Sequence, residues 1–293
     1  MNHKHIREHG ILRGLEATRR SSTSEGRFGR IFRTLPKANF TDEALKKLAD
    51  AMCAEGGPDT PETNKPRDDE ENTGISSGYT YLGQFIDHDI TFDPASSLQK
   101  ENDPDALEDF RTPRFDLDNI YGRGPDDQPY LYESNGRKFV LSSRMLTGSG
   151  FDSNVRDLPR NQPNQSDTGA EKRAIIGDPR NDENVIVSQL QAMFLRFHNR
   201  MVDLMPNADF CDIQRMVRWH YQYVVINDFL PTILGEETMK KIFPHLAKKT
   251  SLSANKPEPE YYKWHNQPFM PVEFSVAAYR FGHSMIRPIY RLN

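Results

Sequence analysis

The sequence predicts a mainly α-helical fold with long irregular connections. Three segments, 185–205, 211–229 and 274–285, carry apolar residues at the three- and four-residue spacing of a helix that packs on a core. No segment shows sustained alternation of apolar and polar residues, which favours helices over a sheet. Hydrophobic residues make up 36% of the chain and the mean hydropathy is -0.76, so much of the chain is expected in polar loops.

The first elements expected along the chain are a basic arm over residues 1–33 and a short helix over 42–52. The arm has an excess of Lys and Arg, and a solvated arm lying along the domain is expected rather than a nucleic-acid patch. Thr41 is a suitable N-cap for the helix, whose leucines and alanines have helical spacing. Everything after the arm, 34–293, is expected to form one domain.

Two polar segments are expected to be loops. Residues 54–72 are dense in Pro, Gly, Asp and Glu, which is typical of an exposed loop. Residues 148–172 are rich in Asn, Gln, Asp and Pro and have no apolar period, so a second loop is expected there.

Three helices are expected in the second half of the chain. The first covers 185–205 and carries one apolar stripe, made of Ile186, Leu190, Met193, Phe194, Phe197, Met201 and Leu204. The second covers 211–229 and ends before Pro231; its inward residues are expected to be Ile213, Met216, Val217, Val224 and Phe229. The third, over 274–285, is expected to be buried.

Composition and charge disfavour several classes of protein. With 38 Lys and Arg against 42 Asp and Glu, the net charge of -4 gives no general attraction for nucleic acid or an anionic membrane. Apolar runs fall well short of the roughly 18 residues of a membrane helix, so no span is expected. Residues 1–10 have no apolar signal core, so a cytoplasmic location is expected, with export by another route left open. Two cysteines cannot build a disulfide framework.

The first segment that could carry chemistry is Gly83–Asp89. On a helix Gln84 and His88 share a face, while Asp87 and Asp89 point about 100° to either side. An imidazole would then face a pocket, with a carboxylate on each flank. A capped helix with a satisfied histidine is the plain alternative, and a metal hydrolase stays open because His and Asp are common metal ligands.

The second segment, 112–118, has the spacing of a cation-binding loop. Side-chain oxygens at Thr112, Asp116 and Asp118, with the carbonyl of Arg114, fall on every second residue. Calcium takes about six to eight oxygens, so this loop needs further ligands, and Asp89 could supply one. A solvent-facing polar strand is the alternative.

The third segment, 177–184, runs directly into the long helix. Asn181 or Asp182 is expected to cap that helix, and Glu183 suits the dipole of its first turn. Helix capping accounts for the whole segment except Arg180.

The fourth segment, 279–283, places a histidine in an apolar helix. Such a histidine is usually a satisfied core residue. Gly282 precedes it, and glycine costs a helix about 1 kcal/mol, so it is tolerated where something flat must approach the backbone.

Together, and in this order, these segments resemble the animal-type haem peroxidase family of the peroxidase-cyclooxygenase superfamily. Gly83–Asp89 is similar to its distal-histidine motif and 177–180 to its distal-arginine motif. Residues 195–200 match the signature of the following helix, and 279–283 match the proximal-histidine motif. The calcium-loop match lies between the first two, and the resemblance covers about 74–293.

The resemblance implies a helical peroxidase fold and a role for each residue. His88 would be the distal base, which moves a proton from the bound oxygen of hydrogen peroxide to the departing one. Arg180 would stabilise the negative charge that develops as the O–O bond breaks. Gln84 would line the pocket, and His283 would ligate the haem iron from the other side.

The implied cofactors are haem b and calcium. Asp87 and Glu183 match the two carboxylates that form ester links to haem in this family, and Arg280 belongs to the cofactor-binding proximal motif. The residues that match the calcium ligands are Asp89, Thr112, Arg114, Asp116 and Asp118.

Some positions depart from the family pattern. Asn184 stands where myeloperoxidase has a methionine linked to haem, so that third link should be absent. Asp118 stands where mammalian members have serine, and its charge should favour calcium. His198 belongs to a signature that is structural rather than catalytic. Family domains continue well beyond the proximal histidine, so we expect a domain whose C-terminal part is missing.

Three functions follow from the resemblance. The first is a peroxidase that reduces hydrogen peroxide and oxidises halide, phenolic or similar small donors. The second is a fatty-acid dioxygenase, in which a tyrosine lies three residues before the proximal histidine. Arg280 holds that position here and Tyr279 is one residue away, about 100° around the helix, which favours the peroxidase. The third is a catalytically silent haem-binding fragment. The sequence specifies neither the donor nor the oligomeric state.

Overall fold

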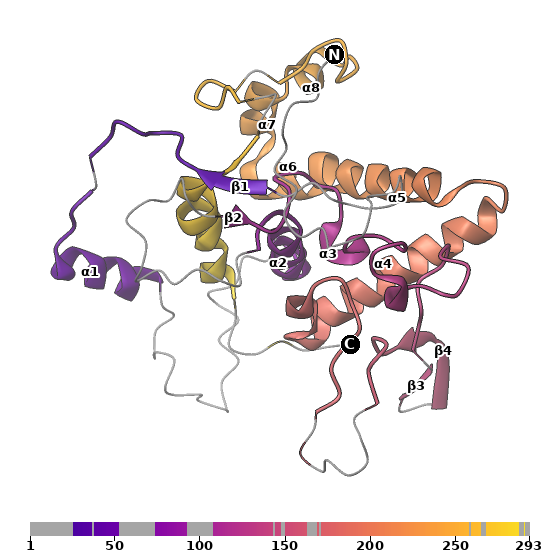
Figure 1. The fold of residues 1–293 in the computed structure, drawn as a ribbon. Helices are drawn as coiled ribbons and strands as arrows, with labels where there is room; N and C mark the ends of the chain where they lie inside the picture. The colour runs from indigo at the N-terminus through magenta and orange to yellow at the C-terminus, as the bar shows by residue number, and fades with distance from the viewer. Residues whose placement is uncertain are drawn as a thin grey trace.

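The computed structural model describes most of the chain, and helices dominate it (Figure 1). The described residues are 26–36, 38–52, 74–92, 108–142, 144–147, 150–162, 169, 171–257, 259–264, 268–286 and 290. The expected mainly α class is confirmed. None of the helices in this part of the chain is long and apolar enough to cross a membrane.

The structure has eight α-helices and several single-turn or wider helical segments within the described residues. The α-helices are α1 (Asp42–Met52), α2 (Gly78–Ile90), α3 (Asp118–Tyr121), α4 (Val185–Leu204), α5 (Phe210–Val224), α6 (Leu230–Leu234), α7 (Glu236–Ile242) and α8 (Pro244–Lys248). The 3-10 segments are η2 (Pro129–Leu131), η3 (Pro179–Asp182) and η6 (Tyr279–Met285); the π-helical ones are η4 (Val225–Phe229) and η5 (Glu273–Ala278).

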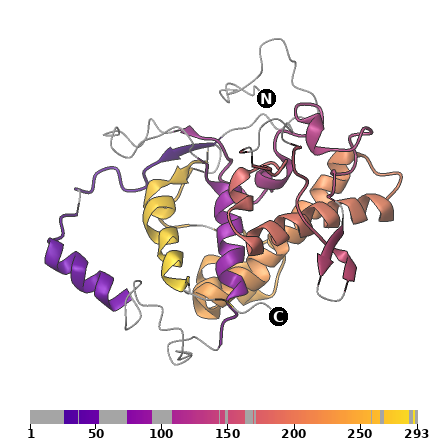
Figure 2. The same ribbon diagram turned by 90° about the horizontal axis from the view of Figure 1, so that it is seen from below.

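Helix α2 is the centre of the fold. It contacts α3, α4, η3 and η6, so segments from four regions of the sequence meet along it. Figure 2 shows α2 between the C-terminal helical segment on one side and α4 on the other. The two sides of α2 are therefore covered by different parts of the chain.

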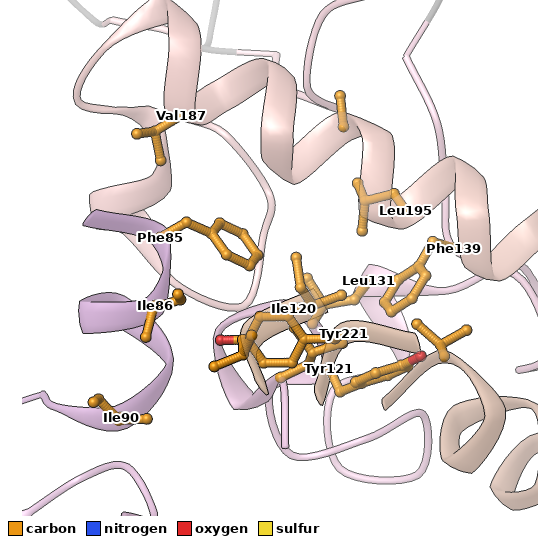
Figure 3. Packing of buried hydrophobic residues seen from close by; sticks show 14 of the residues in the cluster. Phe85, Ile86, Ile90, Ile120, Tyr121, Leu131, Phe139, Val187, Leu195 and Tyr221 are labelled. Carbon is orange, nitrogen blue, oxygen red and sulfur yellow. The ribbon is translucent and has the colours of Figure 1, made fainter. Parts of the chain in front are cut away.

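The core fixes the rotation of α2. Phe85 and Ile86 are buried and point from α2 toward α3, α4 and α5 (Figure 3). The ring of Phe85 stacks on Phe194 at 4.9 Å between centroids and meets the edge of Tyr221 at 6.2 Å. Burying one such side chain is worth about 1.5–3 kcal/mol. This packing decides which face of α2 is left for the remaining side chains.

Short strands tie the two ends of the described chain together. They are β1 (Gly26–Gly29), β2 (Glu108–Asp109) and β5 (Met270–Pro271), and β1 pairs antiparallel with β2 and parallel with β5. The strand order is β2-β1-β5. The sequence did not predict these strands because they are too short to show apolar alternation. Their pairing also depends on segments far apart in the sequence. Gly26 is required because a Cβ there would lie 2.1 Å from the Arg111 carbonyl oxygen.

The start of the chain after β1 is also tied to the C-terminal segment. The Glu273 carboxylate accepts hydrogen bonds from the backbone N–H groups of Ile31 at 3.0 Å and Phe32 at 3.1 Å. The described end of the basic arm therefore contacts the domain, while the boundary placed after residue 33 stays a prediction.

Helix α1 has the predicted bounds. The Thr41 hydroxyl accepts a hydrogen bond from Ala44 N at 3.2 Å, as expected of an N-cap. No residue of α1 is buried, and both ribbon views place the helix at the periphery. The loop predicted over 54–72 lies outside the described residues.

The loop predicted over 148–172 is wrong for its first part. Strand β3 (Arg144–Thr147) pairs antiparallel with β4 (Gly150–Arg156) to form a hairpin. The two strands are close together in the sequence and pair through their backbones.

Helix α4 has the predicted position, but its buried stripe is rotated. The predicted stripe is only half-buried, and Met193 and Leu204 are exposed. The buried stripe lies one residue later, about 100° around the helix, and consists of Val187, Gln191, Leu195, His198 and Val202. Polar residues enter this stripe because each makes specific hydrogen bonds, which an apolar periodicity cannot reveal.

Pro231 does not end the second predicted helix. The chain passes from α5 through the π turn η4 into α6, where Leu230 N donates to the carbonyl of Val225. This wider turn makes room for the proline ring, and the helix ends at Gly235 with φ of 80°. Of the expected inward residues, Ile213, Val217 and Phe229 are buried, Met216 is half-buried, and Val224 is exposed.

The segment 274–285 is helical as predicted, but it is not buried. Elements η5 and η6 form it, and in this region only Ser275 is buried. One side lies against α2, whereas Val276 and Phe281 are exposed. The apolar pattern gave the helix correctly and its burial wrongly, because only one side of it meets a described neighbour.

Candidate functional site

His88 lies on the C-terminal half of α2 and is buried. Its Nδ1 is 2.7 Å from Oδ1 of Asn181, a residue of η3. Burial lowers the pKa of His88 below its usual 6.5, and the nearby Arg180 lowers it further. The imidazole is therefore neutral at neutral pH, which a proton acceptor requires.

Arg180 lies against the C-terminal end of α2, which carries His88. Its Nη2 donates to the backbone oxygen of His88 at 3.1 Å and to that of Thr91 at 2.6 Å. Its guanidinium also sits over the ring of Phe92, 4.6 Å from the centroid. The two residues that the sequence assigned to peroxide chemistry are thus joined through the end of α2.

A buried carboxylate and a second arginine hold Arg180, and sequence reasoning missed this network. Asp178 is 2.8 Å from Arg180 Nη2 and 2.7 Å from Arg111 Nη2. Arg111 Nε also donates to the His88 carbonyl at 3.3 Å. Burial acts to raise the pKa of Asp178, but the two arginines outweigh it and lower that pKa. The motif carries Asp178 two residues before Arg180, but nothing in the sequence pairs it with Arg111.

Gly177 allows this segment to approach α3 closely. A Cβ at Gly177 would lie 2.7 Å from the carbonyl oxygen of Asn119, so any larger residue would push the segment away. Gly177 thus sets the depth of the turn that carries Asp178 and Arg180.

Gln84 and Glu183 meet across the space between α2 and η3. Gln84 Nε2 donates to the Glu183 carboxylate at 3.3 Å, and Gln84 Oε1 accepts from Asn184 Nδ2 at 3.1 Å. Gln84 is half-buried and Glu183 is exposed, so both can reach a ligand.

The cap predicted for α4 is wrong. Asn184 is the N-cap, accepting from the backbone N–H groups of Ile186 at 3.1 Å and Val187 at 2.9 Å. Asn181 is instead bound to His88, and Asp182 pairs with Arg160 at 2.6 Å. Both predicted residues have the right chemistry for a cap, but each is used by a partner distant in the sequence.

Asp87 faces the proximal segment rather than η3. Arg280 Nη1 is 3.4 Å from the Asp87 carboxylate, and the hydroxyl of Tyr279 donates to the Gly83 carbonyl at 2.8 Å. Of the two carboxylates predicted to bind haem, Asp87 thus contacts η6, while Glu183 contacts Gln84 of α2.

His283 lies on η6 with an exposed side chain. Residues three apart eclipse one another in a 3-10 helix, so His283 follows Arg280 on the side that turns toward α2. A Cβ at Gly282 would meet only Met285 Cε, at 3.7 Å, among the described residues. The backbone beside His283 is thus open to an approaching group, and no hydrogen bond from the described part of the chain occupies its ring.

The predicted calcium ligands also come together in part. Asp89 is fully buried, and its carboxylate oxygens make no hydrogen bond of normal geometry to a described residue. Burial, followed by the charges of Asp116 and Asp118, raises the pKa of Asp89. The Thr112 hydroxyl is 2.5 Å from the Asp116 carboxylate. These acidic side chains lie close together, whereas the side chain of Arg114 is exposed.

Arg218 of α5 partly balances this acidic group. It donates to the carbonyl of Asp116 and lies 3.9 Å from the Asp118 carboxylate. Within the described residues no set of three or more His, Cys, Asp or Glu side chains is arranged closely enough to hold a metal ion as it stands.

His198 has the structural role predicted for it. The hydroxyl of Tyr121 lies 3.1 Å from His198 Nδ1, and Nε2 lies 2.8 Å from the Arg137 carbonyl. Both ring nitrogens are used inside the core, remote from the residues of the site.

Parts of the chain are similar in sequence to known peroxidases. The chain is 29% identical over 123 residues to a chorion peroxidase of Aedes aegypti, and 27% identical over 126 residues to human thyroid peroxidase. These matches cover 39% and 40% of this chain, but only 15% and 12% of those relatives. A solved structure, peroxidase A from Dictyostelium discoideum, has a TM-score of 0.45 and 17% identity, over 71% of this chain and 46% of that one.

The family comparison covers more of the chain. Residues 109–293 match the sequence model of the family described as animal haem peroxidase, a family whose membership implies haem binding. This match takes in the segments 112–118, 177–184 and 279–283. Since it spans more than half of the sequence, the chain belongs to the animal haem peroxidase family.

Proposed function

We propose that this chain acts as a haem peroxidase, which reduces hydrogen peroxide and oxidises small donors. One observation carries the proposal: Arg180 is bonded to the backbone of His88, while the same helix meets the segment of His283 on another side. A distal base, a cation that stabilises the developing negative charge and an axial ligand are the three parts that this reaction requires. The matched part of the chain covers only 15% of the Aedes aegypti chorion peroxidase. The proposal is therefore based on the residues of this chain and not on the activity of that relative.

The residues present fit haem. His283 and Glu183 are exposed, so both can reach a bound haem. Gln84 is half-buried, and the backbone at Gly282 has open space beside it. Arg280 places a positive charge near α2. Bound haem b would supply the iron that binds and activates peroxide. His283 would ligate that iron, and Asp87 and Glu183 would form the ester links to haem.

The chain's own residues would then handle the protons and the charge. The neutral His88 would take a proton from one oxygen of hydrogen peroxide and return it to the other, which leaves as water. Arg180 would stabilise the negative charge that develops on the departing oxygen, and Gln84 would orient the small molecules in the pocket. Two electrons from the donor, with two protons from the donor or the solvent, complete the reduction of hydrogen peroxide to two water molecules. Halides and phenols are the proposed donors.

We also propose that calcium binds between α2 and the loop before α3. Its ligands would be the carboxylates of Asp89, Asp116 and Asp118, with the Thr112 hydroxyl and the Arg114 carbonyl. The support is geometric: both carboxylate oxygens of Asp89 are buried without a hydrogen bond to a described residue, and Asp116 and Asp118 are near enough to raise its pKa, after burial itself. A cation there would fix the helix position next to His88.

The dioxygenase alternative loses support from the position of Tyr279. A tyrosine that abstracts hydrogen from a lipid must present its hydroxyl to the substrate, whereas that of Tyr279 donates to the Gly83 carbonyl at 2.8 Å. Tyr279 thus helps to hold η6 against α2.

Initial rates of iodide and phenol oxidation in the haem-reconstituted full chain test the proposed function. His88→Ala should lower the rate by about 10²–10⁴-fold, the range expected for loss of a general base. The matched control is His220→Ala, because His220 is exposed on α5 and bonds only the Met216 carbonyl of its own helix among the described residues. Equal rates in both variants, or no peroxide-dependent oxidation, would overturn the proposal.

A further inference from the structure

Three buried polar side chains are hydrogen-bonded in series, beginning at His88. His88 Nδ1 lies 2.7 Å from Asn181 Oδ1, and Asn181 Nδ2 donates to Gln191 Oε1 at 2.6 Å. Asn181 and Gln191 are fully buried and His88 nearly so. The three residues come from η3, α4 and α2, and the peroxidase motifs assign no role to Asn181 or Gln191.

The direction of these hydrogen bonds determines where the proton of His88 resides. An amide oxygen can only accept, so the neutral ring must carry its proton on Nδ1. The other ring nitrogen, Nε2, then keeps its lone pair and can act as a base. In water both tautomers of a neutral histidine are populated and the proton is mostly on Nε2, the form that could not accept a proton there. The active tautomer therefore has to be imposed.

Gln191 opposes a flip of Asn181 alone. If the Asn181 amide flipped, its oxygen would face the oxygen of Gln191, and two acceptors cannot bond each other. Both amides would have to turn together, inside the packed core, for His88 to carry its proton on Nε2. Gln191 Nε2 makes no hydrogen bond to a described residue, so Gln191 acts on Asn181 through this one bond.

The segment that carries Asn181 is itself held in place. Asp178 accepts from Arg180 N at 2.9 Å at the start of η3, and Asp182 pairs with Arg160 at its end. Asn181 directly follows Arg180, so one turn both places the arginine and orients the histidine.

We infer that Asn181 and Gln191 are positioning residues, which fix the proton of His88 on Nδ1 and leave Nε2 free for peroxide. This inference rests on the proposed peroxidase function. Neither residue touches a reacting atom. The plain alternative is that they only satisfy one another in the core, in which case their removal would change stability and leave the tautomer as it is.

Nitrogen NMR of the haem-free full chain, with 15N-labelled histidine, separates the two. The resonances of His88 are identified by their loss in His88→Gln, and the spectra are taken at one pH where the ring is neutral. The native chain should show a pyrrole-type Nδ1 and a pyridine-type Nε2. In Asn181→Leu and Gln191→Leu the proton should move wholly or partly to Nε2. Gln191→Glu, whose carboxylate still accepts from Asn181, should restore the native pattern.

Asn199→Leu is the matched control, because Asn199 is a buried amide on the same helix that bonds only the backbone of Phe139 among the described residues. It should lower stability comparably and leave the His88 tautomer unchanged. In haem-loaded protein, Gln191→Leu should lower kcat by about tenfold or more, with haem affinity and the KM for the donor nearly unchanged.

Two outcomes would overturn the inference: a native His88 protonated on Nε2, or a tautomer that Asn181→Leu and Gln191→Leu leave unchanged. Neither depends on turnover. If the tautomer shifts as expected while the loaded native protein fails to react with peroxide, the proposed function fails and the positioning of His88 stands.

Discussion

At the scale of single residues, His198 shows how a buried histidine is held neutral. The Tyr121 hydroxyl donates to Nδ1 and the Nε2–H donates to the Arg137 carbonyl, so both nitrogens are satisfied without a positive charge. Burial lowers the pKa of His198 to about 4. A proton added to Nδ1 would remove the bond from Tyr121 and place a charge among aromatic rings.

This predicts a specific loss of stability in acid. The folded chain resists protonation at His198 until about pH 4, whereas the unfolded chain takes the proton near pH 6.5. The free energy of unfolding should therefore fall as the pH drops from 6.5 to 4, by about 3 kcal/mol from this residue. Urea unfolding of the native chain and His198→Gln measures it as the difference between the two pH dependences. Identical slopes for both chains would contradict the prediction.

Single residues also mark the limit of sequence reasoning about the site. His88, Arg180 and Gln84 could be named from motifs, and the structure places them around one helix and turn. Asp178, Arg111 and Gln191 could not, because each acts through a hydrogen bond to a residue far along the chain. Asn181 has a side chain suited to capping a helix, but in the structure this side chain is hydrogen-bonded to His88 instead.

At the scale of elements, periodicity predicted helices well and their surroundings poorly. The bounds of α1 agree with the prediction, and those of α4 differ by one residue at the C-terminal end. The buried side of α4 was wrong because hydrogen-bonded polar residues replace apolar ones on it. The passage through Pro231 was wrong because a π turn precedes the proline, and a π turn has no sequence period of its own.

The acidic loop between α2 and α3 should respond to calcium in a characteristic way. Without the cation, Asp89, Asp116 and Asp118 repel one another. Asp116→Asn removes one charge, so it should raise the calcium-free Tm by about 2–4 °C for roughly 1 kcal/mol. The same change should abolish the rise in Tm that calcium gives the native chain.

The control for this measurement is Asp50→Asn, which changes an exposed carboxylate on α1. It should leave both the calcium-free Tm and the response to calcium as they are. A native chain whose Tm does not respond to calcium, or an Asp116→Asn chain that responds as strongly as the native one, would rule the site out.

At the scale of the whole molecule, the site depends on segments that the sequence keeps far apart. Only the resemblance to a family could place the distal and proximal motifs together, because no local pattern links 83–89 with 279–283. In the structure the Asp87–Arg280 ion pair and the Tyr279–Gly83 hydrogen bond make that link. The sheet β2-β1-β5 was not predicted, since pairing between segments far apart in the sequence decides it. The hairpin β3–β4 is local, but it was missed because its residues show no apolar alternation.

The ester links to haem are a test of this whole-chain arrangement. Asp87 and Glu183 lie on different segments: Asp87 on α2 contacts Arg280, and Glu183 after η3 contacts Gln84 of α2. After reaction with peroxide, haem in the native chain should resist extraction by acidified organic solvent. Asp87→Ala with Glu183→Ala should release it while the far-UV circular dichroism stays native. Haem that extracts freely from the peroxide-treated native chain would contradict the links, though not the peroxidase chemistry.

The visible spectrum of the full chain titrated with haem tests haem binding and peroxide reactivity most directly. We predict a saturable Soret band that shifts when hydrogen peroxide is added and returns when a donor is supplied. His283→Ala should weaken or remove the band, and His88→Ala should keep the band while slowing the shift. The absence of a Soret band with haem, or a band that neither peroxide nor His283→Ala alters, would contradict a haem peroxidase with His283 as its iron ligand.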